Sequence, residues 1–244
     1  MKDNFSLQSD DYALYRPDYP QELIDYLISL IEDPNKCWDC GTGNGQLAVK
    51  LAATFQQIEA TDISERQLAN AVQKSNIRYS LQSAEKTNFT EKSFDLITVA
   101  QAAHWFDFER FNPEVNRVLK PKGIIALIGY GLVKMNSELD EIIEDFYWNV
   151  TKPFWDPERN HIEAKYQTIP FPFEELDTPS FEMSKEVSLE QLVGYIGTWS
   201  AVQHYTKANG ASPMPALKSS LEQIWKYGSR RAYFPLFTRV GRNP

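Results

Sequence analysis

The nine residues Cys37-Trp38-Asp39-Cys40-Gly41-Thr42-Gly43-Asn44-Gly45, CWDCGTGNG, decide the fold of this chain. Two interpretations overlap on this stretch. One is a C-x-x-C pair that carries redox chemistry or binds a metal ion. The other is a glycine-rich turn that holds a nucleotide-like cofactor. The two interpretations predict different proteins, so the sequence around the stretch has to separate them.

The cysteine interpretation does not suit its position. Redox C-x-x-C motifs usually present the first cysteine at a helix N-terminus, whereas Cys37 and Cys40 lie in or at the end of a predicted strand. In an extended strand these two side chains project to opposite faces. The chain has only these two cysteines and three scattered histidines, which disfavours a zinc site and excludes a disulfide scaffold. We expect two buried, apolar-like cysteines and no metal.

The glycine interpretation suits its position. Gly41, Gly43 and Gly45 lie between a predicted strand at 36–40 and a predicted helix at 46–55. Glycine permits a sharp bend and a close approach of backbone to ligand, and the helix N-terminus offers amides to polar or anionic groups. Asp62, 17 residues after Gly45, ends the next predicted strand, where an acidic side chain can accept both hydroxyls of a ribose.

The residues in and after the turn narrow the choice of cofactor. A phosphate-binding loop needs Gly-Lys-Ser/Thr, which is missing here. A dinucleotide site prefers G-x-G-x-x-G, but the sixth position of this turn is Gln46. Acidic Asp39 precedes the turn. An acidic group is acceptable where no pyrophosphate binds, and it is useful if the cofactor carries an ammonium group.

Strands and helices alternate through the first half of the chain. Predicted strands cover 36–40, 58–61, 77–82, 94–100 and 124–128, and predicted helices cover 46–55, 64–74 and 107–119. This alternation predicts an α/β fold with a doubly wound, mostly parallel sheet and helices on both faces. The strand at 94–100 is nearly all apolar, which is typical of a strand buried on both faces.

The rhythm changes after Gly131. Helices are predicted at 137–150, 188–199 and 216–227, strands at 181–187 and 232–240, and an irregular, aromatic-rich stretch at 151–172. We therefore expect a helical cap inserted near the C-terminus. The predicted organisation is an N-terminal segment at 1–35, an α/β core at 36–131, a substrate-side cap at 132–180 and 188–228, and last strands of the core sheet at 181–187 and 229–244.

Composition limits the partners. The chain has 244 residues, 42% hydrophobic and 24% charged, with a net charge of −8 and a pI near 5.0. An acidic chain without a basic block disfavours nucleic acid as a partner. No apolar run reaches the roughly 18 residues that a membrane span needs, and the N-terminus lacks a signal-peptide core. We expect a cytoplasmic protein with a small-molecule partner; the oligomeric state is not indicated.

Five ordered stretches carry a resemblance to a known family: CWDCGTGNGQLAVKLA, ATDISERQLANA, SAEKTNF, SFDLITVAQAAHWFD and NRVLKPKGIIALIGYG, between residues 37 and 131. Together they resemble class I S-adenosylmethionine-dependent methyltransferases, which have a Rossmann-like fold. YRPDYP upstream and GYIGTWSAVQHY downstream are similar to the group that contains trans-aconitate methyltransferase and related small-molecule enzymes.

The resemblance implies S-adenosylmethionine as the cofactor and assigns roles to residues. It implies that the methionine half is lined by Asp39, Gly41, Gly43, Gly45 and Gln101, that Asp62 and Ile63 meet the ribose and adenine, that Ser83, Ala84 and Glu85 meet the adenine edge, and that Tyr15 and Arg16 close over the cofactor. Many relatives have Asp where this chain has Ser83. Arg16 is suited to bind the cofactor carboxylate with two hydrogen bonds.

The acceptor side is less determined. His104 and Trp105 follow the buried strand at 94–100, and ligands bind beyond the carboxyl ends of such strands. His104 is either a general base or a residue that orders its loop, and Trp105 is expected in the pocket wall. The resemblance places Trp199, Ser200 and His204 on the substrate side, with core packing as the alternative for Trp199.

The predicted reaction is methyl transfer to a small molecule, with an organic acid carboxylate as the favoured acceptor. A carboxylate has a pKa near 4 and needs no base at neutral pH, whereas a hydroxyl acceptor would need one, and His104 is the first candidate. Two alternatives stay open. One is a nicotinamide-dependent oxidoreductase, which Gln46 opposes; the other is a non-catalytic protein that binds S-adenosylmethionine.

Overall fold

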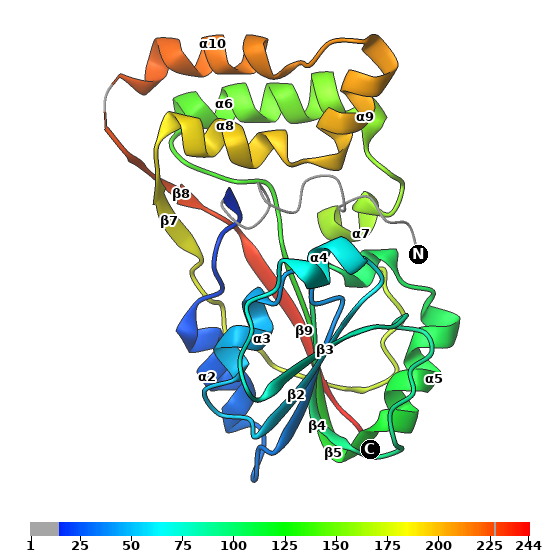
Figure 1. The fold of residues 1–244 in the computed structure, drawn as a ribbon. Helices are drawn as coiled ribbons and strands as arrows, with labels where there is room; N and C mark the ends of the chain where they lie inside the picture. The colour runs from blue at the N-terminus through cyan, green and yellow to red at the C-terminus, as the bar shows by residue number, and fades with distance from the viewer. Residues whose placement is uncertain (1–14, 227) are drawn as a thin grey trace.

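The fold was analysed in a computed structural model that describes residues 15–226 and 228–244. Its core is a seven-stranded sheet in the order β3-β2-β1-β4-β5-β9-β6 (Figure 1). The strands are β1 Lys36–Cys40, β2 Gln57–Asp62, β3 Ile77–Leu81, β4 Phe94–Ala100, β5 Leu119–Tyr130, β6 Glu174–Leu176 and β9 Leu236–Arg242. Neighbours from β3 to β5 pair in parallel, and β9 runs antiparallel to β5 and β6. The predicted doubly wound, mostly parallel α/β fold is confirmed.

Helices cover both faces of this sheet. Helices α2 (Gln21–Ser29) and α3 (Gln46–Leu51) pack on one face and α5 (Phe108–Val118) packs on the other, and each face has its own apolar cluster. Six of the seven residues of β4 are buried, as predicted for a strand covered on both sides. The short helix α4 (Glu65–Ala69) follows β2, and the Ser64 hydroxyl caps it by accepting the Gln67 N–H at 3.3 Å.

Cys37 and Cys40 belong to different faces, as the strand geometry predicts. Cys37 lies in the cluster under α2 and α3, and Cys40 lies in the cluster under α5. Both are free and almost fully buried. Burial raises the pKa of both thiols well above the ordinary range. Since the thiolate is the reactive form, both are inert packing residues.

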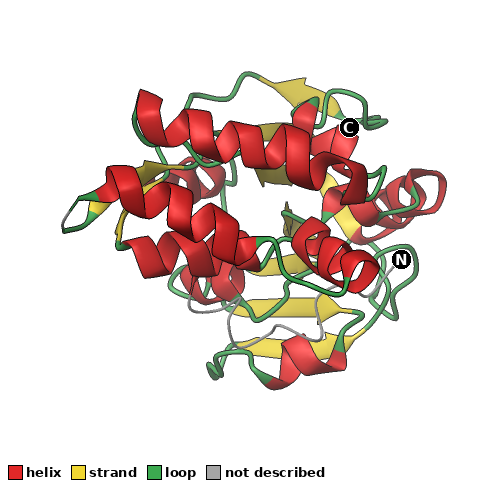
Figure 2. Cartoon of the chain, turned by 90° about the horizontal axis from the view of Figure 1, so that it is seen from above, coloured by secondary structure: helices red, strands yellow, loops and turns green. Residues whose placement is uncertain are grey.

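A second layer of helices lies beyond the carboxyl ends of the strands, at the top of Figure 1 and nearest the viewer in Figure 2. Its members are α6 Ser137–Asp145, α8 Leu189–Gly197, α9 Ser200–Asn209 and α10 Met214–Trp225. Between α6 and α8 lie the π-helix Phe146–Thr151 and the short helix α7 (Arg159–Glu163). The Ser188–Gln191 capping box that opens α8 is complete. None of the described helices is both long and apolar enough to cross a bilayer.

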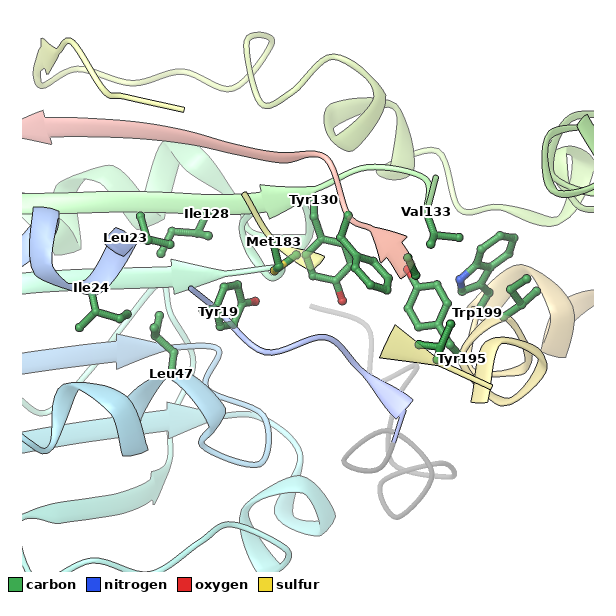
Figure 3. Packing of buried hydrophobic residues seen from close by; sticks show 14 of the residues in the cluster. Tyr19, Leu23, Ile24, Leu47, Ile128, Tyr130, Val133, Met183, Tyr195 and Trp199 are labelled. Carbon is green, nitrogen blue, oxygen red and sulfur yellow. The ribbon is translucent and has the colours of Figure 1, made fainter. Parts of the chain in front are cut away.

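One apolar cluster joins this helical layer to the sheet. It continues from Leu23 and Ile128 in the core, through Tyr130, to Tyr195 and Trp199 in the helical layer (Figure 3). The two parts therefore share buried surface along this side. The description of residues 132–180 and 188–228 as a substrate-side cap stays a prediction.

One strand assignment is wrong. The stretch at 181–187 does not join the core sheet; its strand β7 (Ser184–Val187) pairs with β8 (Arg230–Tyr233) in a separate two-stranded sheet. The place beside β9 belongs to β6, which lies in the stretch assigned to the cap. The predicted strand at 232–240 is also divided, because Pro235 has no N–H for a sheet and separates β8 from β9. Alternation of apolar and polar residues predicts a strand, but it does not predict which strand pairs with it.

Candidate active site

The glycine turn leaves the sheet at its switch point. Strand β1 lies between β2 and β4, and the chain proceeds to opposite sides of it. Ligands of open α/β sheets bind beyond the carboxyl ends of strands at such a point. Gly41, Gly43 and Gly45 have φ values of +67°, +57° and +84°, the left-handed region that glycine adopts at little cost.

The three glycines differ in what surrounds them. A Cβ on Gly41 would lie 2.6 Å from the Cβ of Ala102, and one on Gly45 would lie 2.2 Å from the Tyr79 hydroxyl. A Cβ on Gly43 would meet nothing closer than Gln67 Oε1 at 3.9 Å. Gly41 and Gly45 therefore permit close packing behind the turn, whereas Gly43 leaves space open in front of it.

Asp62 is fixed against the turn. Its Oδ2 accepts the backbone N–H of Gly43 and its Oδ1 accepts that of Ser64, both at 2.9 Å. The carboxylate at the end of β2 is thereby held beside the bend after β1. This rigid position suits an acceptor for the two hydroxyls of a ribose, as the sequence predicts.

Asp39 is a buried carboxylate at the end of β1. It is 1% exposed, and its two oxygens accept the hydroxyls of Thr42 at 2.5 Å and Thr98 at 2.7 Å. Burial raises its pKa from 3.8 to about 6, although these hydrogen bonds oppose the rise. A positive group bound beside Asp39 would stabilise the carboxylate that burial disfavours.

These residues line a first cavity over the turn. Its walls are Tyr19, Asp39, Gly41, Thr42, Gly43, Asn44, Gln46, Leu47, Asp62, Ile63, Ser64, Gln67, Ala100, Gln101, Ala102 and Trp105. Two carboxylates and no lysine or arginine occur among these described residues. The first cavity therefore fits an ammonium group and ribose hydroxyls, and it offers no cation for a pyrophosphate.

Several residues predicted for the cofactor lie outside the first cavity. Gly45 packs on Tyr79, and Tyr15 packs on Gly194 of α8. In the loop after β3, the Ser83 hydroxyl bonds to the Glu85 carboxylate, and that carboxylate also accepts the Asp107 N–H at 3.2 Å. Ala84 lies buried in the apolar cluster under α5.

A second cavity adjoins the first, and Gln101 and Trp105 line both. Its walls are Arg16, Gln101, His104, Trp105, Tyr130, Gly131, Trp155, Asp156, Arg159, Tyr195, Trp199 and Ser200. It brings together five residues that the sequence predicts for the site: Arg16, predicted for the cofactor, and His104, Trp105, Trp199 and Ser200, predicted for the acceptor side. A molecule in the second cavity would lie next to a ligand in the first.

His104 is buried in the wall of the second cavity. His104 is 8% exposed, and its Nδ1 atom lies 3.2 Å from the Tyr166 hydroxyl. Burial, and next the charge of Arg159, hold the pKa of His104 well below its ordinary value. The imidazole is therefore neutral near pH 7.

Arg159 brings a positive charge to the second cavity. It begins α7, and its guanidinium lies 4.5 Å from the Trp155 ring centre and 5.6 Å from that of Tyr147, whose hydroxyl accepts from Nε at 3.2 Å. Within residues 15–226 and 228–244, its terminal nitrogens form no hydrogen bond or ion pair. The buried indole N–H of Trp155 has no acceptor in that part of the chain either. Donors without acceptors favour an anionic ligand.

Arg16 and His204, two residues predicted for the site, lie in different places. Arg16 Nη1 donates to the Tyr130 hydroxyl at 3.0 Å, and the guanidinium lies 5.4 Å from the Tyr195 ring centre, so Arg16 lines the second cavity and not the first. The His204 Nδ1–H donates to the Phe154 carbonyl at 2.9 Å, and His204 lines neither cavity.

Some residues of the site were not predicted from the sequence. Tyr130 ends β5, the strand beside β4, and Gly131 follows it. Because ligands bind beyond the carboxyl ends of such strands, their positions could have been predicted. Trp155 and Arg159 lie in the irregular stretch, where no periodicity exists to place them. Thr98 had a weak signal: it is a hydroxyl within an apolar strand.

Comparisons with known proteins agree with this geometry. Residues 38–127 match the methyltransferase domain family. A Dictyostelium discoideum protein named as a methyltransferase is 32% identical over 92% of this chain and 87% of its own length. A Schizosaccharomyces pombe methyltransferase without a described role is 28% identical over 81% and 79%. A solved structure from Anaeromyxobacter dehalogenans, described as a type II methyltransferase, is 35% identical with a TM-score of 0.86 and covers 93% of this chain and 98% of that one.

The fold is that of a class I methyltransferase. The chain belongs to the S-adenosylmethionine-dependent methyltransferase family, and S-adenosylmethionine is its cofactor. This decides against the nicotinamide-dependent oxidoreductase. A methyl acceptor is implied by the family, and its identity is a separate question.

Proposed function

We propose that this enzyme transfers a methyl group to the carboxylate of a small organic acid and produces a methyl ester, in the manner of the group that contains trans-aconitate methyltransferase. S-adenosylmethionine supplies the electrophilic methyl on a sulfonium. The first cavity holds the cofactor in this proposal, with Asp62 at the ribose, Ile63 at the adenine and Asp39 near the ammonium. The second cavity holds the acid.

The choice of a carboxylate as acceptor rests on Arg159. Its guanidinium faces a cavity next to the cofactor site, and its terminal nitrogens have no partner within the described residues. A carboxylate forms short, directed hydrogen bonds with a guanidinium, and such charge-assisted pairs are about twice as strong as neutral ones. The indole N–H of Trp155 is a further donor beside it.

The lowered pKa of His104 makes its imidazole a weak base, which agrees with an acceptor that is already ionised. The neutral imidazole is buried and engaged with Tyr166. A carboxylate needs no proton removed at neutral pH, so the chain has only to orient it and exclude water. Trp105, Trp199 and Tyr195 supply apolar walls for that purpose.

The first test is product identification. The purified chain is incubated with S-adenosylmethionine carrying a labelled methyl group and with matched acceptors: carboxylic acids, phenols, amines and thiols. We expect label in the acids alone, in a product that mild alkali releases as methanol, because esters hydrolyse under conditions that ethers and methylamines survive. Label confined to phenols, amines or thiols would overturn the proposal.

A parallel binding measurement separates the non-catalytic alternative. S-adenosylhomocysteine should raise the melting temperature, and NAD should not. A chain that binds S-adenosylhomocysteine but labels nothing, either in the acceptor panel or in a cell extract, would be a binding protein.

A further inference from the structure

A third hollow lies beside the second cavity. We call it the outer groove; its walls include the mostly apolar side chains of Leu132, Tyr147, Trp148, Ile162, Pro235 and Phe237. Gly131 and Arg159 line both the outer groove and the second cavity. The two hollows are therefore adjacent, and we call their boundary at these two residues the junction.

Gly131 has no side chain at the junction. A Cβ there would meet nothing closer than the Pro235 carbonyl oxygen at 3.9 Å, and Gly131 does not adopt the left-handed conformation. By contrast, a Cβ on Gly129 would lie 2.4 Å from the Phe237 ring. Neither the backbone nor packing requires glycine at 131, so a larger side chain there would occupy space at the junction that glycine leaves free.

The outer groove offers an apolar ligand unfilled surface. Trp148 is 50% exposed, among the most exposed large hydrophobic side chains of the described residues. Two further charged side chains line the groove, Glu163 and Lys165. The Glu163 carboxylate is already engaged by the Tyr147 hydroxyl at 2.6 Å and by Lys152 at 2.5 Å. Exposed aromatic surface next to a binding cavity favours an apolar occupant.

We infer that the acceptor is an organic acid with an apolar tail: the carboxylate binds Arg159 in the second cavity, and the tail passes Gly131 into the outer groove. This inference rests on the proposed function and names its substrate class. The carboxylate and the tail would thus be held on the two sides of one junction.

Chain length is the direct test. We compare kcat/KM for straight-chain acids of two, six and ten carbons. Full burial of one methylene corresponds to about a fourfold gain in binding. We expect kcat/KM to rise at least tenfold from six to ten carbons, because the added methylenes would lie against the apolar walls of the groove.

A matched pair of variants tests the junction. Gly131→Leu should lower the ratio of kcat/KM between the ten-carbon and six-carbon acids at least tenfold. Gly197→Leu is the control: a Cβ there would meet nothing within 4 Å and Gly197 lies outside the groove, so both activities should stay unchanged. Trp148→Ala should lower the same ratio about threefold or more. The Kd for S-adenosylhomocysteine, measured in each variant, reports correct folding.

The outcomes are distinct. Acids methylated without any length preference would overturn the tail and leave the proposed function intact. An equal loss for both acids in Gly131→Leu would make the junction part of the carboxylate site and also overturn the tail. If no acid is methylated although S-adenosylhomocysteine binds, both proposals fail.

Discussion

The Nδ1 atom of His104 lies 3.2 Å from the hydroxyl of Tyr166, and the two rings are stacked with 6.2 Å between their centres. One imidazole nitrogen is therefore engaged on the side of the core. Because burial also lowers the pKa of His104, a charged imidazolium does not form near neutral pH. This pair makes His104 a residue of the cavity wall, and its part in the chemistry can be tested.

His104→Gln should retain methylation of a carboxylic acid within about tenfold, because an ionised acceptor needs no base. General base catalysis typically contributes 100-fold or more. The measurement is kcat against pH from 6 to 9 for the native and variant enzymes. Tyr166→Phe, which removes the hydroxyl partner, is the matched control for packing. A loss above 100-fold with the acid would contradict an acceptor that needs no base.

Asp62→Asn should weaken S-adenosylhomocysteine binding by about 10- to 100-fold, because hydrogen bonds to a charged acceptor contribute about 1.5–3 kcal/mol. The amide also replaces one of the two oxygens that accept from Gly43 and Ser64. Calorimetric titration measures the Kd. Asp107→Asn, a change at the N-cap of α5 outside both cavities, should leave the Kd unaltered. Equal affinities for native enzyme and Asp62→Asn would remove Asp62 from the ribose site.

Because of Asp39, both the stability of the chain and its affinity for the cofactor should depend on pH. Its pKa is raised to about 6 in the folded chain, mainly by burial, so between pH 4 and 6 the folded state binds more protons than the unfolded state. The sign follows: the contribution of Asp39 to stability is most favourable below pH 4, falls as the pH rises through 6, and is constant above. The rise in pKa corresponds to roughly 3 kcal/mol.

Asp39→Asn should therefore melt at a higher temperature than the native chain at pH 8 without cofactor, and the difference should shrink toward pH 4. The same variant should bind S-adenosylhomocysteine more weakly, since the ammonium loses its counter-charge. Melting curves across this pH range check the first part, and titration checks the second. A variant less stable than the native chain at pH 8 would mean that the hydrogen bonds from Thr42 and Thr98 outweigh the cost of burying the charge.

The sequence predicts those parts of the site that depend on short-range patterns. The unit of β1, turn and α3 follows from glycine spacing, and Asp62 follows from the end of the next strand. These residues reach one cavity because parallel strands bring their carboxyl ends to one edge. Strand β7 shows the limit: its alternation is local, but its pairing with β8 depends on contacts far apart in sequence.

Arg159 shows a second limit. It begins a helix of five residues inside an irregular, aromatic-rich stretch. No apolar periodicity exists there, so sequence assigns no element and no direction to the side chain. Its place between Trp155 and Tyr147 is set by tertiary packing alone.

Arg159→Met should raise KM for the acid by about 10- to 100-fold and leave the Kd for S-adenosylhomocysteine unchanged, because Arg159 lines the second cavity and not the first. Arg159→Lys should recover only part of the loss, since an ammonium lacks the paired donors of a guanidinium. Initial-rate kinetics with a saturating methyl donor separate KM from kcat. Arg110→Met, at an exposed position of α5, controls for net charge. A change in cofactor affinity as large as that in KM would contradict a role confined to the acceptor.

Gln101 lines both cavities and has a φ of +53°. Its side-chain N–H donates to the Tyr130 carbonyl at 3.0 Å, and its backbone N–H donates to the Ile128 carbonyl at 2.8 Å, so the strained conformation is held from two points. Gln101→Gly and Gln101→Ala both remove the side-chain bond, and their comparison isolates the backbone. The glycine variant should be the more stable by about 1 kcal/mol, because a left-handed conformation costs other residues about 1–2 kcal/mol. Denaturant unfolding of the two variants measures the difference, and equal stabilities would show that position 101 relaxes once its side chain is lost.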